Sequence, residues 1–170
     1  MSNVFHIGCL HLGHSKCAEF RGFPSSEEHD ENLIERWNSV VNKRAKVFIH
    51  GDISMENSRH YHLLDRLLGD KHVILGNHDR PQDVAKLLEH VDRVSGPIKY
   101  NGFWLTHIPV HPSEFEYRGL IGNIHAHIHD RKLDVNDQYF NVDAQEVNYF
   151  PMPFKTIEEF FKLKQTSKCQ

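Results

Sequence analysis

Cysteine is scarce in this sequence, which has three in 170 residues, Cys9, Cys17 and Cys169. An odd number of cysteines without regular spacing does not make a disulfide framework and is typical of free thiols in a reducing compartment. The first residues also lack the basic and apolar segments of a secretory signal peptide. We therefore expect a cytoplasmic protein.

A long apolar run and a strong charge of either sign are also absent. No apolar run approaches the roughly 20 residues that a membrane-spanning helix needs, so we expect no membrane partner. The 20 basic and 23 acidic residues leave a net charge of -3, which argues against an extended basic surface for duplex nucleic acid. With 39% hydrophobic residues, the chain can bury the core of one domain over residues 1–170.

Apolar periodicity predicts an α/β chain in which strands and helices alternate in the first half. This alternation favours right-handed crossovers and parallel pairing of the strands. Short apolar runs indicate strands at about residues 4–8, 46–50, 72–75, 103–107, 139–142 and 147–149. Helical spacing indicates helices at about residues 26–43, 57–68, 83–90 and 157–164.

Histidine is the residue that the sequence has in excess, with 15 in the chain. One stands in Leu75-Gly76-Asn77-His78-Asp79, directly after an apolar run. The Asn carbonyl can bind a metal ion, the His can bind metal or donate a proton, and the Asp can orient the His. Because Gly, Asn and Asp also build ordinary turns, this motif alone does not separate a site from a loop.

Similar polar groups follow the other predicted strands. Ligands of open parallel sheets bind beyond the carboxyl ends of the strands, so we expect these side chains to converge at one edge. The converging set is Cys9, His11, Asp52, Asn77, His78, His107, His127 and His129.

The segment His125-Ala126-His127-Ile128-His129 has two interpretations. In an extended strand its three histidines would point the same way, because side chains alternate between faces. A turn at Ala126 would instead make them diverge.

The converging set has more donors than one four-coordinate metal ion needs. Two ions bridged by Asp52 would use the set economically, and such a pair can clamp a phosphate and hold a hydroxide for in-line attack. A single zinc ion would leave several histidines without a role.

These motifs resemble the calcineurin-like metallophosphoesterases, and most of all the small members from bacteria and phages. That family's pattern runs Asp-x-His, Gly-Asp, Gly-Asn-His-Asp or Glu, a lone His, and Gly-His-x-His. The resemblance covers about residues 4–145 and implies an α/β fold, a two-sheet β-sandwich flanked by helices in four αββα layers. The matching segments are Cys9-x-His11, Gly51-Asp52, Gly76-Asn77-His78-Asp79, His107 and Ala126-His127-x-His129.

The resemblance implies a site for two divalent transition-metal ions, which would be manganese, zinc, iron or nickel. It assigns Cys9, His11 and His129 to the first ion, Asn77, His107 and His127 to the second, and Asp52 to both.

The resemblance also implies that His78 contacts the phosphate or protonates the leaving oxygen and is held by Asp79. His14 follows the first motif in a Leu-Gly-His segment and is a candidate substrate contact. Arg21 is another, because guanidinium groups pair well with phosphate.

Two residues depart from the family pattern. Ala126 replaces a glycine, which is tolerated unless the position needs a positive φ. Cys9 replaces the first aspartate and allows three interpretations. Its thiolate could bind the first ion and favour zinc or iron. It could be a neutral bystander beside a weak or absent first ion. It could also mark a degenerate site in a protein that only binds partners.

The implied function is a metal-dependent phosphoesterase. The absence of a large cap domain favours an open cleft and phosphodiesters over monoesters, with nucleotides or nucleic-acid ends as substrates on family grounds. The alternative is a binding module of the same fold that acts through protein partners. A monomer and a homodimer are both compatible with the sequence.

Overall fold

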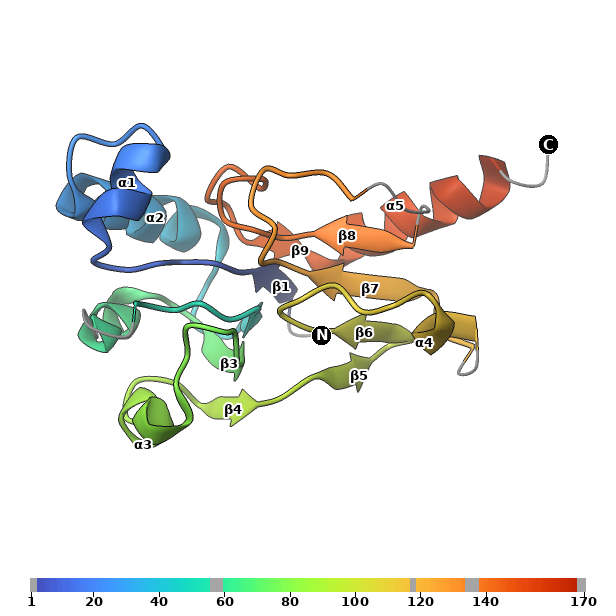
Figure 1. Ribbon diagram of the computed structural model, residues 1–170, viewed down its shortest axis with the longest axis horizontal. Coiled ribbons are helices and arrows are strands. Elements are labelled where there is room, and N and C mark those ends of the chain that lie inside the picture. Colours follow the sequence, from blue (N-terminus) through green and yellow to red (C-terminus); the bar gives the residue numbers. More distant parts are fainter. Residues whose placement is uncertain (1–2, 56–59, 117–118, 134–137, 168–170) are drawn as a thin grey trace.

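The computed structural model describes residues 3–55, 60–116, 119–133 and 138–167, and it contains two β-sheets flanked by helices (Figure 1). The five-stranded sheet has the order β4-β3-β2-β1-β9 and the four-stranded sheet the order β5-β6-β7-β8. The predicted two-sheet α/β fold is confirmed. The strands are β1 (Val4–Ile7), β2 (Lys46–Ile49), β3 (Asp70–Ile74), β4 (Arg93–Ser95), β5 (Ile98–Tyr100), β6 (Phe103–Leu105), β7 (Gly122–His125), β8 (Tyr139–Asn141) and β9 (Met152–Pro153).

The two longest described helices are α2 and α5. Helix α2 begins after Ser25, whose hydroxyl accepts the N–H of Glu28 at 3.2 Å as an N-cap. The helices are α1 (Ser15–Phe20), α2 (Ser26–Val40), α3 (Val84–Leu87), α4 (Ser113–Glu116) and α5 (Phe154–Ser167), with 3-10 helices η1 (Tyr61–Arg66) and η2 (Pro81–Asp83).

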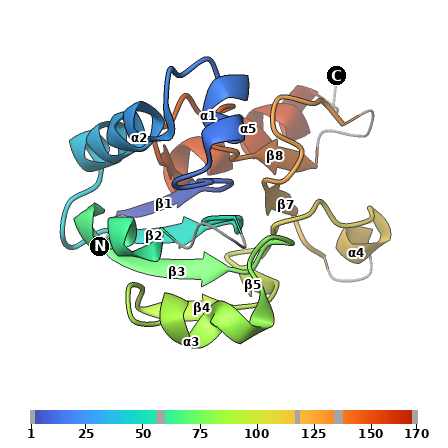
Figure 2. The ribbon, with the colours of Figure 1, turned by 60° about the vertical axis from the view of Figure 1, so that its left-hand side comes forward.

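Parallel pairing brings the strand ends to one edge. Strands β1 to β4 pair parallel, with Ile7 opposite Ile49 and Ile49 opposite Val73. Strands β6, β7 and β8 also pair parallel to one another. A parallel bridge from Gly8 to Asp143 joins the two sheets just beyond β1 and β8. The loops that follow the strands therefore meet where the sheets meet, as Figure 2 shows from a second direction.

Aromatic side chains fill the core between the layers. Phe48 of β2 lies against Tyr100 of β5, with ring centroids 4.9 Å apart. On α5, Phe161 lies 5.0 Å from Phe103 of β6. Trp37 of α2 is fully buried and donates its indole N–H to the carbonyl of Leu68 at 2.9 Å.

Several predicted elements differ from those observed. Residues 147–149 form turns rather than a strand, because Asn148 and Tyr149 have positive φ angles of 52° and 62°. Residues 152–153, for which no strand is predicted, form β9, in which Pro153 pairs antiparallel with Phe5 at the sheet edge, where proline is tolerated.

The predicted helices also differ in extent. The helix expected at residues 57–68 is a 3-10 helix over Tyr61–Arg66, and its expected beginning at Asn57 lies outside the described residues. The helix expected at residues 83–90 contracts to Val84–Leu87. The last helix begins earlier than expected, at Phe154. In the part of the chain that is described, no helix is long and apolar enough to cross a bilayer.

A pair of buried histidines lies between the sheets. Nδ1 of His50 donates to the carbonyl of Thr106 at 2.8 Å, so its Nε2 accepts from Nδ1 of His6 at 3.0 Å. Burial lowers the pKa of His50 to about 3 and lowers the pKa of His6 well below its usual value. Both rings are therefore neutral in the folded protein at pH 7.

This pair predicts a loss of stability in acid. In the unfolded chain histidines are protonated below about pH 6.5, whereas His50 stays neutral in the folded protein. The free energy of unfolding therefore keeps its full value at a pH above about 6.5 and decreases as the pH falls further. His50 alone accounts for a loss of about 2 kcal/mol between pH 7.5 and 5.0. Urea unfolding in EDTA measures this loss. The acid-induced loss should be about 2 kcal/mol smaller in His50→Gln than in the unaltered protein. It should be unchanged in His62→Gln, which replaces an exposed histidine. Equal losses in all three proteins would contradict this account.

Candidate metal centre

The predicted metal ligands occupy loops with left-handed backbone. Positive φ is uncommon outside glycine and costs about 1–3 kcal/mol per residue, so it persists where the surrounding structure fixes it, often at functional sites. Five of the seven predicted ligands adopt it: Cys9 (52°), His11 (50°), Asp52 (53°), His127 (70°) and His129 (53°). Left-handed turns directly after the strands, rather than extended chain, bring these side chains to the edge.

Close contact between loops explains the glycines of two motifs. Gly51 has a φ of 71°, and a Cβ at this position would lie 2.5 Å from the backbone nitrogen of Gly76. A Cβ at Gly76 would in turn collide with the carboxylate of Asp52. Only glycine at both positions lets the two loops approach closely enough to place Asp52 beside Asn77.

The donors assigned to the second ion converge on Nε2 of His107. The Oδ1 of Asn77 lies 2.8 Å from this nitrogen, Nδ1 of His127 lies 3.1 Å from it, and Oδ2 of Asp52 lies 3.3 Å from it. The opposite nitrogen of His107 donates to the carbonyl of His50 at 2.8 Å. That bond fixes the ring with Nε2 facing the other donors, as in a metal-binding histidine.

The protonation states in this group suit a cation. Burial opposes ionisation of Asp52, but its hydrogen bond and charge interaction with His107 outweigh burial and lower its pKa to about 2. Burial and the nearby His107 lower the pKa of His127. His107 is the exception: burial lowers its pKa, but Asp52 raises it further, so the net direction is upward. Because Asp52 favours the protonated form of His107, a metal ion at this nitrogen would have to compete with a proton.

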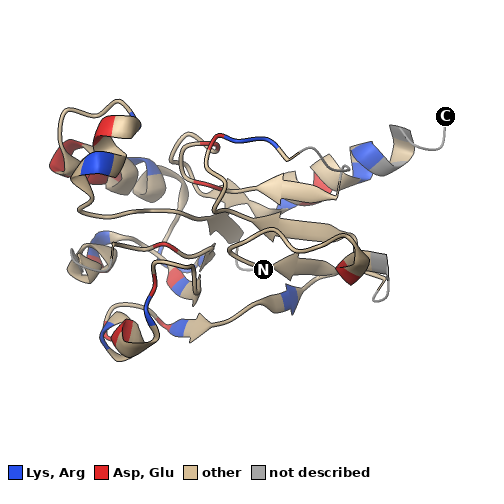
Figure 3. Cartoon of the chain, in the orientation of Figure 1, with Lys and Arg blue, Asp and Glu red and all other residues tan. Residues whose placement is uncertain are grey.

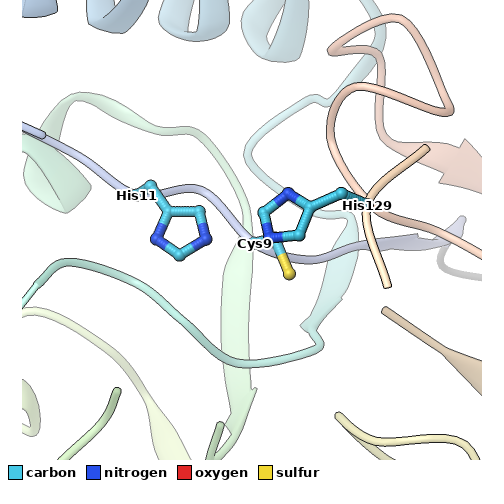
Figure 4. Close-up of side chains that lie close together, drawn as sticks. All are labelled: Cys9, His11 and His129. Carbon is cyan, nitrogen blue, oxygen red and sulfur yellow. The ribbon is translucent and has the colours of Figure 1, made fainter. Parts of the chain in front are cut away.

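The donors assigned to the first ion form a second group. Potential ligand atoms of Cys9, His11 and His129 lie within 4.8 Å of one another, and Figure 4 shows the three side chains close together. The rings of His11 and His129 stack at 5.3 Å with an interplanar angle of 11°. Nε2 of His11 lies 3.9 Å from Oδ2 of Asp52, so Asp52 lies beside both groups.

Unpaired buried atoms indicate that this group fits a metal ion. Among the described residues, neither ring nitrogen of His11 has a hydrogen-bond partner, although its side chain is 5% exposed. Burial, with Arg21 nearby, lowers the pKa of His11 to about 3, which leaves the ring neutral with a lone pair available. Buried polar atoms without a partner are rare in native proteins and call for an explanation. A divalent cation held by His11, Asp52 and Cys9 would supply one.

Cys9 is a thiol until a cation is present. Burial raises its pKa well above the usual value, and the charges of Asp143 and Asp52 raise it further. The N–H of His127 donates to its sulfur at 3.2 Å. A bound cation would favour the thiolate, because metal ions bind the deprotonated form.

Asp143 belongs to this site although the motifs did not include it. Its side chain is fully buried, and its Oδ2 lies 3.5 Å from Nδ1 of His129, although neither atom has a hydrogen-bond partner among the described residues. The charge of Asp143 also raises the pKa of the Cys9 thiol. In metal sites, a carboxylate beside a ligating histidine orients the ring. Asp143 follows β8 as the other polar groups follow their strands. A search for polar residues directly after the strand predicted at residues 139–142 would therefore have found it.

Arg21 lies behind the first loop rather than at its open face. Its side chain is fully buried, donates from Nη2 to the carbonyl of Cys9 at 2.8 Å and pairs with Asp143 at 3.5 Å. A further contact joins Nη1 to Nε2 of His29 at 3.0 Å. A direct substrate contact by Arg21 is incompatible with this burial, and we assign it a positioning role instead.

His14 lies at the rim of the first group. Its Nδ1 accepts the N–H of Cys17 at 2.8 Å and so caps α1. Its ring lies 6.2 Å from the ring of His11. This half-buried position leaves one face of His14 beside the cluster, where a substrate contact stays a prediction.

His78 and Asp79 lie in the loop after β3 and differ in burial. The half-buried ring of His78 lies 5.9 Å from the ring of His11, and the backbone N–H of His78 donates to Oδ1 of Asp52 at 3.0 Å. The buried carboxylate of Asp79 accepts the backbone N–H groups of Asp52, Ile53 and Gly76 at 2.8 to 3.0 Å. Asp79 thus ties the loop of Asp52 to the loop of His78.

The chain turns after β7, so the histidines of that segment diverge. The N–H of Ile128 donates to the carbonyl of Ala126 at 2.8 Å. His127 joins the second group and His129 the first, whereas His125 is buried against Tyr139 with ring centroids 5.9 Å apart. Burial lowers the pKa of His125 to about 4.

The methyl group of Ala126 is accommodated by the opposite strand. Ala126 is fully buried and does not have a positive φ. A Cβ at Gly8 would lie 2.5 Å from the Cβ of Ala126. The glycine at position 8 therefore provides the space that alanine needs at position 126.

Comparison with known proteins agrees with this arrangement of two sheets flanked by helices. The family model described as calcineurin-like phosphoesterase matches residues 2–165. The chain therefore belongs to the calcineurin-like phosphoesterase family, and we describe it from here on as a metallophosphoesterase.

A phage protein and two solved structures are similar to it. The Gene 66 protein of Mycobacterium phage D29 is 41% identical over 98 residues, which are 55% of this chain and 49% of the phage protein. The chain thus matches about half the length of that relative. An Aquifex aeolicus protein of unknown function has a TM-score of 0.75 at 17% identity, covering 94% of this chain and 99% of the other. The Pseudomonas putida nuclease MPE has a TM-score of 0.51 at 19% identity, covering 74% and 61%.

Proposed function

We propose that this metallophosphoesterase is a phosphodiesterase that uses two divalent metal ions to hydrolyse nucleotides or nucleic-acid ends. The single observation that carries the proposal is the position of Asp52. Its Oδ2 lies 3.3 Å from the His107 nitrogen of one donor group and 3.9 Å from the His11 nitrogen of the other. One ionised carboxylate between two groups of donor atoms is suited to bridge a pair of cations.

Each donor group has its own role in this proposal. One ion would be held by Cys9, His11 and His129. The other would be held by Asn77, His107 and His127. The ions would supply positive charge against the phosphate oxygens and lower the pKa of a water molecule. His78 lies beside His11 and outside both groups, where its ring can contact a phosphate oxygen and give a proton to the leaving oxygen.

One observation supports nucleotide substrates, and another supports diesters. The family is one of phosphoesterases, and a nuclease shares the fold. The metal centre also has depressions on both sides. One lies beside Asn77 and His107 and has a volume of about 370 Å³, and the other lies beside His129 and has a volume of about 270 Å³. An opening on both sides of the phosphate accommodates the two substituents of a diester.

Hydrolysis of bis-p-nitrophenyl phosphate by metal-stripped protein tests the proposal. We expect no turnover in EDTA and turnover when manganese, zinc or nickel is added back. Mono-p-nitrophenyl phosphate, measured in parallel, should be the poorer substrate. If folded protein with added metal hydrolyses neither compound nor any nucleotide, the site is degenerate and the alternative, a binding module that acts through protein partners, takes its place.

Cys9→Asp should keep or raise the activity with manganese. Aspartate adopts left-handed backbone more readily than most residues and so suits the φ of 52° at this position. A carboxylate is also a harder ligand than a thiolate, so the preferred ion should shift from zinc toward manganese. The ratio of kcat/KM with manganese to that with zinc measures the shift. A folded but inactive Cys9→Asp protein would contradict both a bystander cysteine and a decayed site.

A further inference from the structure

One depression beside the metal centre is lined by an aromatic ring and by basic side chains, and hydrolysis of a phosphate ester does not itself require the aromatic ring. This depression, the α1 depression, has a volume of about 270 Å³. Two of its lining residues, His14 and His129, also belong to the metal centre or its rim, so the depression opens directly onto the site. Its lining consists of His14, Lys16, Cys17, Phe20, His129, Asp130 and Arg131.

The unusual residue in this lining is Phe20. Its side chain is 66% exposed at the end of α1, although a phenylalanine ring normally gains free energy from burial. Beside it, Ala18 of the same helix is fully buried and faces the core. Helix α1 therefore buries one face against the protein and presents Phe20 toward the α1 depression.

Positive charge lies on two sides of the α1 depression. Lys16 is exposed on α1, and Arg131 is exposed in the loop after β7. Figure 3 marks basic residues on both of these elements. Among the described lining residues, Asp130 is the one acidic residue beside the two basic ones, so these side chains together carry a net positive charge. An aromatic face next to basic side chains is the combination that binds single-stranded nucleotides, because bases stack and phosphates pair with cations.

We propose that the α1 depression binds the nucleoside of the substrate, with the base stacked on Phe20 and Lys16 and Arg131 beside the phosphate chain. This inference rests on the proposed phosphodiesterase function and narrows its substrates to nucleoside phosphodiesters. The opposite depression is lined mostly by apolar residues, among them Leu75, Ile108 and Val110. The asymmetry orients the diester, with its nucleoside on the side of His129 and its leaving group on the side of His107.

Two chromogenic esters test the inference. The p-nitrophenyl ester of thymidine 5′-monophosphate and methyl p-nitrophenyl phosphate share a leaving group and differ only in the nucleoside. Stacking on an aromatic ring predicts that Phe20→Ala lowers kcat/KM for the thymidine ester by about 5- to 150-fold. The methyl ester should change less than twofold. Phe20→Trp should restore the thymidine activity. Phe150→Ala, at a second exposed phenylalanine outside the depression, should leave both esters unchanged.

Calorimetric binding of thymidine 5′-monophosphate to the same metal-loaded proteins provides a readout that does not need turnover. Its affinity should fall at least fivefold in Phe20→Ala and recover in Phe20→Trp. Equal effects of Phe20→Ala on both esters, or unchanged affinity for the nucleotide, would overturn the base-stacking role while methyl ester hydrolysis still supports the phosphodiesterase. Failure of every metal-loaded protein to hydrolyse either ester would contradict the phosphodiesterase, and the binding measurement would then decide the role of Phe20.

Discussion

Asp52→Asn is expected to lower kcat/KM for phosphodiesters by at least about 10³-fold, the scale on which preorganised charge stabilises a transition state. The amide keeps an oxygen that can accept the N–H of His78, so the loop retains its hydrogen bond. The variant loses the negative charge between His11 and His107. These two histidines belong to the two donor groups, each of which would hold an ion. Metal affinity should fall together with activity.

The matched control for this variant is Asp65→Asn. Asp65 is another carboxylate, but its side chain is 58% exposed and pairs with His90 rather than with the site. Its replacement should leave both metal binding and turnover unchanged, and circular dichroism should report the same fold for both variants. An Asp52→Asn protein that binds two ions and turns over diesters normally would contradict the bridging role.

His78→Ala is expected to lower kcat by about 10²- to 10⁴-fold, the range of general acid catalysis, while metal affinity changes little. The ring lies beside His11 but outside both donor groups, and the N–H that contacts Asp52 is a backbone group that alanine keeps. Calorimetric metal titration and steady-state kinetics of the same preparation separate the two effects.

The control for His78→Ala is His62→Ala, which removes an exposed imidazole on η1. It should leave kcat and metal affinity as in the unaltered protein. If metal affinity in His78→Ala falls in parallel with kcat, His78 is a ligand rather than an acid. An unchanged kcat would remove it from the mechanism.

The sequence predicted which residues meet, because each motif marks the end of a strand. His11, Asp52 and His107 lie far apart in the chain, yet parallel pairing brings their loops to one edge. The roles of these residues stay predictions until metal binding is measured. The two-sheet architecture was also predictable, but through the family pattern rather than through periodicity, because strands as short as β5 carry little signal.

The conformations within the loops were not predictable from the same pattern. Two-residue spacing places Cys9 and His11 on one face of an extended strand, whereas the structure uses left-handed turns at both. Such turns are fixed by tertiary contacts, here the hydrogen bond from the N–H of Cys9 to the carbonyl of Gly51. The partnership of Arg21 with Asp143 spans 122 residues of sequence, and no local pattern reports a contact at that distance.

Metal stoichiometry tests the central claim most directly. Metal-stripped protein should be titrated calorimetrically with manganese and with zinc, and the bound metal should be counted by elemental analysis after dialysis. The site of His11, Asp52 and His107 predicts two ions per chain, with Asp52→Asn binding fewer. At most one ion per chain with either metal, from folded protein, would contradict the two-metal site.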